Sequence, residues 1–270
     1  MKKLLIIAVA FFFGEILLHA QGELDEQQKV FFRNERSIGL LLNSDGLGLS
    51  YREAKRINFL NKHLLEIDIG TLKDPKEYKI SNPYVDGGGS FVFGKLNSVI
   101  YIRAGFGHQH ELYRKQDLGG VAVRYFYSGG PVIAVYKPIY YMVLDPIMYQ
   151  GQLEGYSLQE EKFSSDIHEA TDIYGKASFT KGLNEIKALP GLYAKGGFNF
   201  EYSKQDKVIH AIEIGAQVNA FPKTIPIMYN DQNKAIFFSL FVSYRFGVIV
   251  DPMHPEETKL GNLFKKKKEQ

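Results

Sequence analysis

The sequence predicts an all-β protein, an antiparallel up-and-down β-barrel of about ten strands, with eight strands as the alternative. Apolar residues alternate with small or charged residues along most of the chain, which is the pattern of strands with one apolar face. The composition includes 17 Tyr, 20 Phe and 26 Gly. After residue 20 no apolar stretch reaches the ~20 residues that a membrane-spanning helix needs. A chain of this kind can cross a membrane only as a closed barrel, because an open sheet edge cannot be satisfied in lipid.

The first 20 residues have the three parts of a secretory signal peptide. Lys2 and Lys3 precede an apolar run from Leu4 to Leu18, and the small residue Ala20 follows. We therefore expect residues 1–20 to be a signal peptide that is removed after export. Residues 21–35 are polar and charged, and we expect them to form a periplasmic lead-in.

Charge and cysteine content exclude several classes of protein. Lys and Arg number 33 against 30 Asp and Glu, so the balance of charge indicates no nucleic-acid partner. The chain has no Cys, which excludes disulfides, thiolate metal sites and a lipid anchor on cysteine. We expect no cofactor and no metal site.

Ten segments of the mature chain alternate strongly enough to be candidate strands. They are 37–43, 47–53, 62–72, 90–95, 98–111, 119–127, 131–143, 191–203, 207–220 and 235–248. In the last one the apolar face is Phe238, Leu240, Val242, Tyr244 and Phe246, and the opposite face has Ser239, Ser243 and Arg245, with Phe241 as the exception. Residues 36–250 are thus the predicted barrel.

Glycines on the polar face decide which side of the strands points outward. They are Gly39, Gly48, Gly70, Gly105, Gly197 and Gly215. Glycine weakens a strand and gains nothing on a solvated surface, but it makes room inside a narrow barrel. The polar face is therefore predicted to line the interior, and the apolar face to contact lipid.

Connection lengths predict the orientation, because barrels of this type have short periplasmic turns and long outer loops. With the first strand running outward, the long connections 73–89, 144–190 and 221–234 are extracellular. The periplasmic side then has the turns Leu96–Asn97, Ser128–Gly130 and Lys204–Asp206, a medium connection at 54–61 and both termini. The strands that run toward the periplasm end in outward-facing Tyr51, Tyr127, Tyr202 and Phe246, as in an aromatic girdle.

Two segments near the loops are less regular. The segment around Phe91–Phe93 is the weakest strand, and without it a second strand must also be lost, which gives eight. In the long 144–190 loop, apolar residues at roughly helical spacing predict a short helix over the barrel mouth; they are Ile173, Tyr174, Phe179, Leu183, Ile186 and Leu189. Residues 251–270 end in Lys265–Lys268 and are predicted to be a basic periplasmic tail.

Two runs of residues resemble a known group of proteins. They are FVFGKLN, from Phe91 to Asn97, and ASFTKGLNEIKALPGLYAKGGFNFEYS, from Ala177 to Ser203. Together they resemble small outer-membrane β-barrel proteins of Bacteroidota-type bacteria. The resemblance implies a barrel in the outer membrane, in a group in which some barrels are accessory parts of assembly or secretion machines. It implies no functional residue.

The candidate site is a set of charged residues on the inward face, a predicted lumen charge network. Its members are Arg52, Glu66, Asp68, Arg103, Arg124, Lys137, Lys195, Glu201, Glu213 and Arg245. These residues either line a narrow water-filled channel or pair with one another inside a filled barrel. Barrels of about eight strands are filled by their own side chains, so pairing is the favoured interpretation.

Other polar groups suggest weaker sites. His108 and His110 share one strand face, as in half a metal site or an outward-facing hydrolase, but no His-x-Ser occurs in the sequence. The loop residues Asp166, His168, Glu169 and Asp172 suggest a cation site with no fixed geometry. Residues 87–89 are three glycines without a strand-to-helix phosphate pattern.

The sequence therefore predicts a protein that is not an enzyme and has no catalytic residues. It is expected to be a structural or accessory subunit of the Gram-negative outer membrane. Its expected partners are outer-membrane lipid and proteins that bind the 144–190 loop or the C-terminal tail. The alternative is a narrow channel or small-solute transporter that uses the charged lumen.

Overall fold

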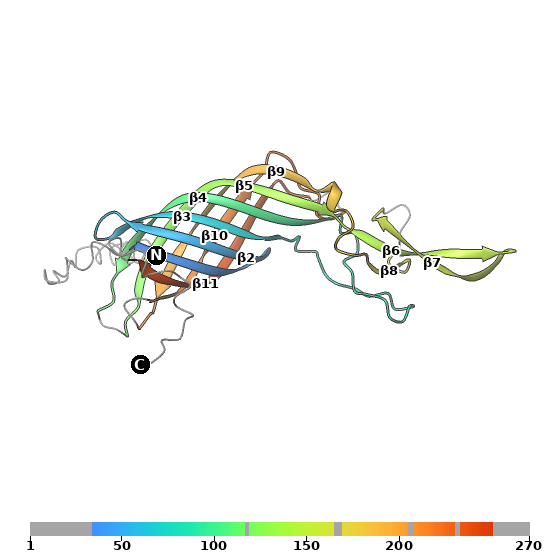
Figure 1. The fold of residues 1–270 in the computed structure, drawn as a ribbon, viewed down its shortest axis with the longest axis horizontal. Coiled ribbons are helices and arrows are strands. Elements are labelled where there is room, and N and C mark those ends of the chain that lie inside the picture. The colour runs from blue at the N-terminus through green and yellow to red at the C-terminus, as the bar shows by residue number, and fades with distance from the viewer. Residues whose placement is uncertain (1–33, 117–118, 165–168, 205–207, 230–232, 251–270) are drawn as a thin grey trace, which may run out of the picture. The chain divides into compact units, whose positions relative to one another are not determined.

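The computed structural model describes residues 34–116, 119–164, 169–204, 208–229 and 233–250. Within them, eight antiparallel strands close a barrel in the order β1-β11-β10-β9-β5-β4-β3-β2 (Figure 1). These strands are β1 (Asn34–Asn43), β2 (Gly46–Arg56), β3 (Asn61–Leu72), β4 (Asn97–Tyr113), β5 (Ala122–Pro138), β9 (Lys187–Glu201), β10 (Val208–Ala220) and β11 (Ile236–Val250). In this part of the chain no helix is long and apolar enough to cross a membrane.

A second, three-stranded sheet is inserted between β5 and β9. It has the order β7-β6-β8 and consists of β6 (Tyr140–Tyr149), β7 (Gln152–Lys162) and β8 (Ile173–Lys176). We call it the outer sheet. A three-residue 3-10 helix, Leu183–Glu185, follows before β9 begins. Figure 1 shows β6 and β7 continuing past the end of the barrel strands.

The prediction of ten strands is wrong, and the alternative of eight is correct. The segments 119–127 and 131–143 were separated at an apparent turn, Ser128–Gly130, but β5 runs through it. Its register with β9 is unbroken from Gly129 to Pro131. Gly130 is needed for packing rather than turning, because a Cβ there would lie 2.8 Å from the Cα of Gly105 on β4. Tyr127 accordingly lies within β5 and does not end a strand.

The segment 90–95 is also not a spanning strand. Phe91 makes an isolated antiparallel bridge with Ile80 and is buried among the outer loops. Its apolar alternation reflects packing in the loops, not a face turned to lipid. Leu96–Asn97 therefore does not form a short turn between two strands, because Asn97 begins β4.

One predicted strand does not exist and two others are one strand, so the predicted directions of β9, β10 and β11 remain correct. The long connections 73–96, 139–186 and 221–235 all leave one end of the barrel, which we call the long-loop end. The connections 57–60, 114–121 and 202–207 leave the opposite, short-turn end, where β1 begins and β11 ends. The described chain thus enters and leaves the barrel at the same end.

The predicted helix is absent from the described residues of the 144–190 loop, 144–164 and 169–190. They contain the end of β6, then β7, β8 and the 3-10 helix, and the start of β9. The apolar residues at helical spacing belong to different elements. Ile173 is buried in β8, Leu183 is in the 3-10 helix, and Leu189 is in β9. The spacing of these apolar residues resembles one face of a helix, but β8 pairs with β6 and the segment forms a strand instead.

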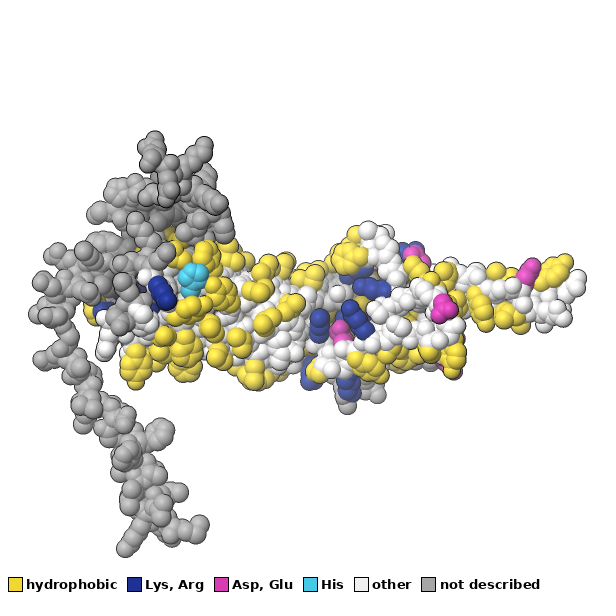
Figure 2. Space-filling view, turned by 90° about the horizontal axis from the view of Figure 1, so that it is seen from below, with side chains coloured by type: hydrophobic (Ala, Val, Ile, Leu, Met, Phe, Trp, Pro, Cys, Tyr) yellow, Lys and Arg dark blue, Asp and Glu magenta, His cyan; other side chains and the backbone are white. Residues whose placement is uncertain are grey.

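The barrel has an apolar exterior and a polar interior. On β11, Leu240 is 60 % exposed, whereas the neighbouring Ser239 is 1 % exposed. The alternation continues along the strand and places Phe241 inward with the polar residues, as the sequence indicates. Figure 2 shows apolar side chains over much of the visible barrel surface. An exposed apolar belt of this extent is unfavourable in water, so the barrel requires apolar surroundings.

Replacing Val242 with Arg tests these surroundings. Val242 lies between Leu42 on β1 and Ile214 on β10, on the outward face. We expect Val242→Arg to destabilise the assembled barrel by roughly 2–4 kcal/mol, as for a cation near the bilayer midplane. The measurement is the folded fraction after refolding into lipid, with Tyr84→Arg in the exposed 73–96 loop as the control. Assembly of Val242→Arg as complete as that of the wild type would show that this face does not contact lipid.

Replacing Gly215 tests the close packing of strands inside the barrel. A Cβ at Gly215 would clash with the carbonyl oxygen of Gly196 and lie 2.8 Å from the Phe241 ring. Gly215→Ala is expected to destabilise the barrel by about 1–3 kcal/mol through overpacking, and Gly215→Phe to prevent assembly. Gly155→Ala is the matched control, because nothing lies within 4 Å of its Cβ position. The unfolding temperature in micelles should fall for Gly215→Ala only.

Candidate functional site

The centre of the barrel holds a buried network of charged side chains. Arg52 Nε donates to Glu66 Oε1 at 2.6 Å, and the same guanidinium also binds Glu213. Arg245 Nη2 donates to Glu213 Oε2 at 3.2 Å. Lys195 Nζ lies 3.6 Å from Glu66 and 3.5 Å from Asp68. These residues come from strands all around the barrel, so the network links its opposite walls.

Neutral polar groups also form hydrogen bonds with these charges. Ser128 Oγ donates to Glu66 at 2.6 Å, and Asn199 Nδ2 donates to Glu213 at 2.8 Å. Arg245 donates to the hydroxyls of Ser37 and Ser50 at 3.2 and 3.1 Å. Such hydrogen bonds are needed because a buried charge pair seldom recovers its desolvation cost from one contact alone.

Arg103 forms the part of the network nearest the long-loop end. It donates to Asp68 at 2.9 Å and to Gln217 at 2.6 Å. Its guanidinium carbon lies 4.7 Å from the ring centroids of both Tyr101 and Tyr193. Two aromatic rings, the Asp68 carboxylate and the Gln217 amide oxygen thus surround the buried guanidinium of Arg103.

The central network is closed to solvent. Glu66, Asp68 and Glu213 are 0 % exposed. They face Arg52, Arg103, Lys195 and Arg245, so three carboxylates meet four cations. Carboxylates that pair with cations inside a filled barrel agree with the favoured interpretation, in which the charges stabilise the barrel and do not line a channel. This arrangement leaves no described charge of this network accessible to a passing solute.

A second ion-pair network lies at the short-turn end. Arg124 binds Glu201, and its Nη1 lies 3.6 Å from Glu35 Oε1. Lys62 also binds Glu35. Arg124 Nε lies 3.7 Å from Glu111. These side chains are buried and join β1, β3, β4, β5 and β9.

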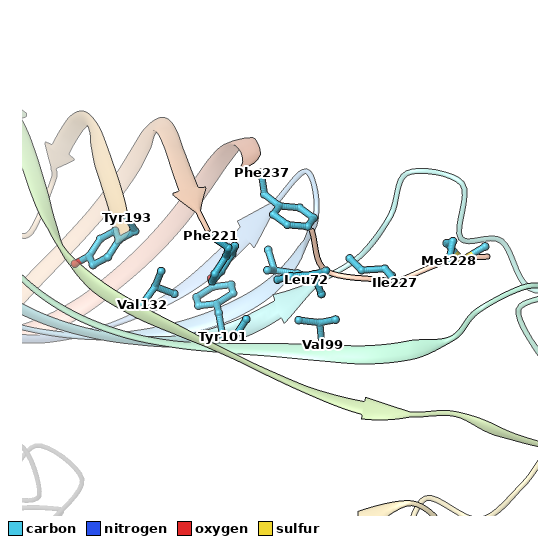
Figure 3. Close-up of a cluster of buried hydrophobic side chains, with 11 residues drawn as sticks. Leu72, Val99, Tyr101, Val132, Tyr193, Phe221, Ile227, Met228 and Phe237 are labelled. Carbon is cyan, nitrogen blue, oxygen red and sulfur yellow. The ribbon is translucent and has the colours of Figure 1, made fainter. Parts of the chain in front are cut away.

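An apolar cluster closes the interior at the long-loop end (Figure 3). It combines residues of the barrel wall with residues of the 221–235 loop; they are Leu72, Val99, Tyr101, Val132, Ala134, Tyr193, Phe221, Ile225, Ile227, Met228 and Phe237. The loop is tied to the barrel by Leu96 N, which donates to Ile227 O at 2.8 Å, and by Asn97 Nδ2, which donates to Pro226 O at 2.7 Å. The polar interior therefore ends at an apolar layer.

The structure places the predicted charged residues in three groups. Arg52, Glu66, Asp68, Arg103, Lys195, Glu213 and Arg245 meet in the central network. Arg124 and Glu201 lie in the network at the short-turn end. Lys137 joins neither, since its Nζ donates to the carbonyls of Phe179 and Lys181 in the connection to β9. It lies almost at the end of β5, where loop carbonyls are nearer than the barrel interior.

Sequence reasoning missed Glu35, Lys62 and Glu111, and also Arg56, whose Nη2 lies 3.9 Å from Glu111 Oε2. Lys62 could have been found, because it lies four residues before Glu66 and therefore on the same face of β3. Glu35 was assigned to the polar lead-in before the barrel, but β1 begins at Asn34, so Glu35 points inward near the strand end. The remaining predicted lead-in, the signal peptide and the basic tail lie outside the described residues.

The two histidines of β4 lie on the barrel exterior. His108 Nε2 lies 3.0 Å from Asn61 Oδ1, and His110 Nδ1 lies 2.7 Å from the same oxygen. Their rings lie near those of Tyr127 and Tyr125. In the part of the chain that is described, no group of three or more His, Cys, Asp or Glu is placed to hold a metal ion. Asp166 and His168 lie outside that part, and Asp172 accepts a hydrogen bond from Glu169 N.

The outer sheet is joined to the 73–96 loop by a small core of its own. Phe91, Ile139, Tyr141, Val143, Phe163 and Ile173 form this core. The Tyr141 hydroxyl lies 2.7 Å from Val92 O and 2.8 Å from Lys95 O, and burial raises its pKa. Asn82 Nδ2 donates to Thr171 O at 2.6 Å and to Ile173 O at 3.1 Å. The two long loops therefore fold as one unit.

Charged groups at the base of the outer sheet also pair. Glu185 binds Lys162 and the Tyr140 hydroxyl, and these hydrogen bonds lower the pKa of the Glu185 carboxyl. Lys181 Nζ lies 2.8 Å from Glu160. Both lysines lie within 6 Å of the Tyr140 ring centroid. Lys162 and Lys181 are thus both paired at the base of the outer sheet.

Comparison with known proteins gives only distant structural likenesses. No family model matches the sequence, and no curated protein matches it. Among solved structures, the chain is similar to Ail, the attachment invasion locus protein of Yersinia pestis, at 8 % identity and a TM-score of 0.36, covering 81 % of this chain and 97 % of that one. It is also similar to Neisserial surface protein A (12 %, TM-score 0.33, 80 % and 96 % covered) and to the N-terminal β-barrel domain of Pseudomonas aeruginosa OprF (8 %, TM-score 0.33, 80 % and 96 % covered). At these TM-scores we take nothing about function from the likeness.

The central network predicts a large effect of removing one buried charge. Glu213→Gln keeps the shape of the side chain but leaves Arg52 and Arg245 short of a carboxylate, so we expect a loss of about 3–5 kcal/mol of unfolding free energy. Glu53→Gln is the control, because Glu53 and its partner Arg36 are each 40 % exposed and such pairs contribute ~1 kcal/mol or less. Denaturant unfolding from micelles measures both. Equal losses for the two variants would contradict the network's role in stability.

Proposed function

We propose that this protein is a β-barrel of the Gram-negative outer membrane and acts there as a non-enzymatic structural or accessory subunit. The observation that carries the proposal is an apolar exterior around an interior filled by paired charges and an apolar layer. A protein of this kind needs apolar surroundings, which a bilayer supplies. The resemblance to small barrels of Bacteroidota-type bacteria is part of the same proposal.

The proposed orientation puts the long-loop end outside the cell and the short-turn end in the periplasm. Short periplasmic turns and longer outer loops are usual for such barrels. Both ends of the described chain lie at the short-turn end, which agrees with export through an N-terminal signal peptide. The basic tail would then be periplasmic and the outer sheet extracellular.

An accessory role is supported by what the long loops contain. They form a sheet and a core of their own that extend the protein beyond the barrel. An open channel is not supported, because the central charges are inaccessible and the 221–235 loop packs into the apolar layer above them. An enzymatic role has no support from the two ion-pair networks either, since their carboxylates are paired with cations.

The proposal is tested by locating the protein and examining its assembly. We expect it in the outer-membrane fraction, and we expect the unheated sample to migrate faster on a gel than the boiled one, because folded barrels resist detergent. Val242→Arg serves as the assembly-defective control. Planar-bilayer recordings should show no discrete conductance steps. Recovery of the mature chain from periplasmic extract without detergent would refute the membrane location, and regular single-channel steps would favour the channel.

The accessory role has its own test. After cross-linking in intact cells and extraction in mild detergent, we expect the protein in complexes with other envelope proteins. Recovery of the chain alone under these conditions would contradict the accessory role while leaving the membrane location unaffected.

A further inference from the structure

The β6–β7 hairpin is packed at its base only. Tyr141 and Val143 are buried in the core of the outer sheet, but every residue from Asp145 to Glu154 is exposed. The hairpin turns at Gln150 and Gly151, which both have positive φ angles, 51° and 81°, as a tight two-residue turn requires. The distal part of the hairpin is therefore a regular pair of strands whose side chains are exposed.

One face of the distal hairpin is apolar. The cross-strand register pairs Leu144 with Leu158, Pro146 with Tyr156, and Met148 with Leu153. Residues that are directly opposite share a face of the sheet. Met148 is 64 % exposed and Tyr156 is 58 % exposed. An exposed apolar row on a paired strand is typical of a binding surface.

The same hairpin has an edge strand, and we call its stretch from Gln152 to Gln159 the free edge of β7. The outer sheet has the order β7-β6-β8, so among the described strands β7 pairs with β6 alone. An edge strand presents unpaired N–H and C=O groups that can accept another strand. The free edge of β7 adjoins the apolar face, so one extended segment can use both.

The charge of the hairpin restricts what can bind. Residues 144–159, toward the tip of the hairpin, contain Asp145 and Glu154 and no Lys or Arg. Nearer the base, Glu160 is already paired with Lys181. Figure 2 shows apolar and acidic side chains on the visible face of the projecting hairpin, whereas the basic ones gather near its base. A second copy would bring the same acids to the interface, and anionic lipid would also be repelled. The edge therefore fits a basic partner.

We propose that the β6–β7 hairpin binds an extended, basic segment of a partner protein, which adds as a strand to the free edge of β7. The main chain of the partner pairs with β7, its alternate apolar side chains contact the Leu153–Tyr156–Leu158 face, and a Lys or Arg residue approaches Glu154. This inference rests on the accessory role proposed above and names the surface and partner chemistry for it.

The test uses synthetic peptides about as long as β7, which has 11 residues. One peptide alternates Lys and Val around a single Trp, and the matched peptide has Glu in place of Lys. Because the protein contains no Trp, the fluorescence of the peptide's Trp reports binding to the full-length protein in micelles. We expect saturable binding of the basic peptide and none of the acidic one.

Two variants and two controls locate the site. Glu154→Lys removes an acidic contact, and the double variant Leu153→Ser/Leu158→Ser removes part of the apolar face; each is expected to weaken binding of the basic peptide about tenfold. Asp86→Lys and Tyr84→Ser are the controls, because both residues are exposed in the neighbouring 73–96 loop. The controls should bind the peptide as the wild type does. Heat-modifiable gel migration verifies that every variant has folded.

The outcomes separate this inference from the accessory role. Absence of binding by the basic peptide, equal binding of both peptides, or equal weakening in the 73–96 controls would overturn the docking surface. Cross-linked dimers of the chain that are lost in Leu153→Ser/Leu158→Ser would also overturn it, in favour of a second copy. If envelope complexes persist in that double variant, the docking surface fails while the accessory role stands.

Discussion

Pairing of the buried charges inside a narrow barrel is the constraint on which the rest of this structure depends. Arg52, Glu66, Glu213 and Arg245 come from four strands and meet in the buried interior of the barrel. An uncompensated charge in that place would be strongly destabilising, so the register of each strand must bring its charge to its partners. The network therefore specifies the order and register of strands that hydrogen bonds alone would leave interchangeable.

The glycines of the interior follow from the same constraint. A Cβ at Gly48 would lie 2.9 Å from the Tyr101 hydroxyl, and a Cβ at Gly70 would clash with the same ring. Gly105 stands in the same relation to Tyr193. The two tyrosines cover Arg103 on both sides and belong to the apolar cluster above it. Small residues on the barrel wall thus create the space in which aromatic rings seal the charged layer.

Outside the barrel, apolar side chains are buried and charged side chains lie at the surface, which is the reverse of the arrangement in the barrel. In the outer sheet Tyr141 and Val143 are buried, and charged residues such as Glu160 and Lys181 pair at the surface. The distal hairpin departs from this arrangement, with its exposed apolar row and Glu154. The interior of the barrel is filled, and the surfaces available to a partner lie on the loops.

The sequence by itself determined the all-β class, the outward apolar face and the inward charges, because strand periodicity is local and places Ser239 and Leu240 on opposite sides wherever the strand lies. It also determined that the long connections share one end. Only the tertiary structure decided the strand number, since the continuity of β5 through Gly130 depends on the close approach of β4, and the burial of Phe91 depends on the outer loops. Likewise, the choice between a helix and β8 was made by pairing with β6, and the separation of Lys137 from the central network was made by loop carbonyls. These are contacts between residues distant in the chain, which local alternation does not encode.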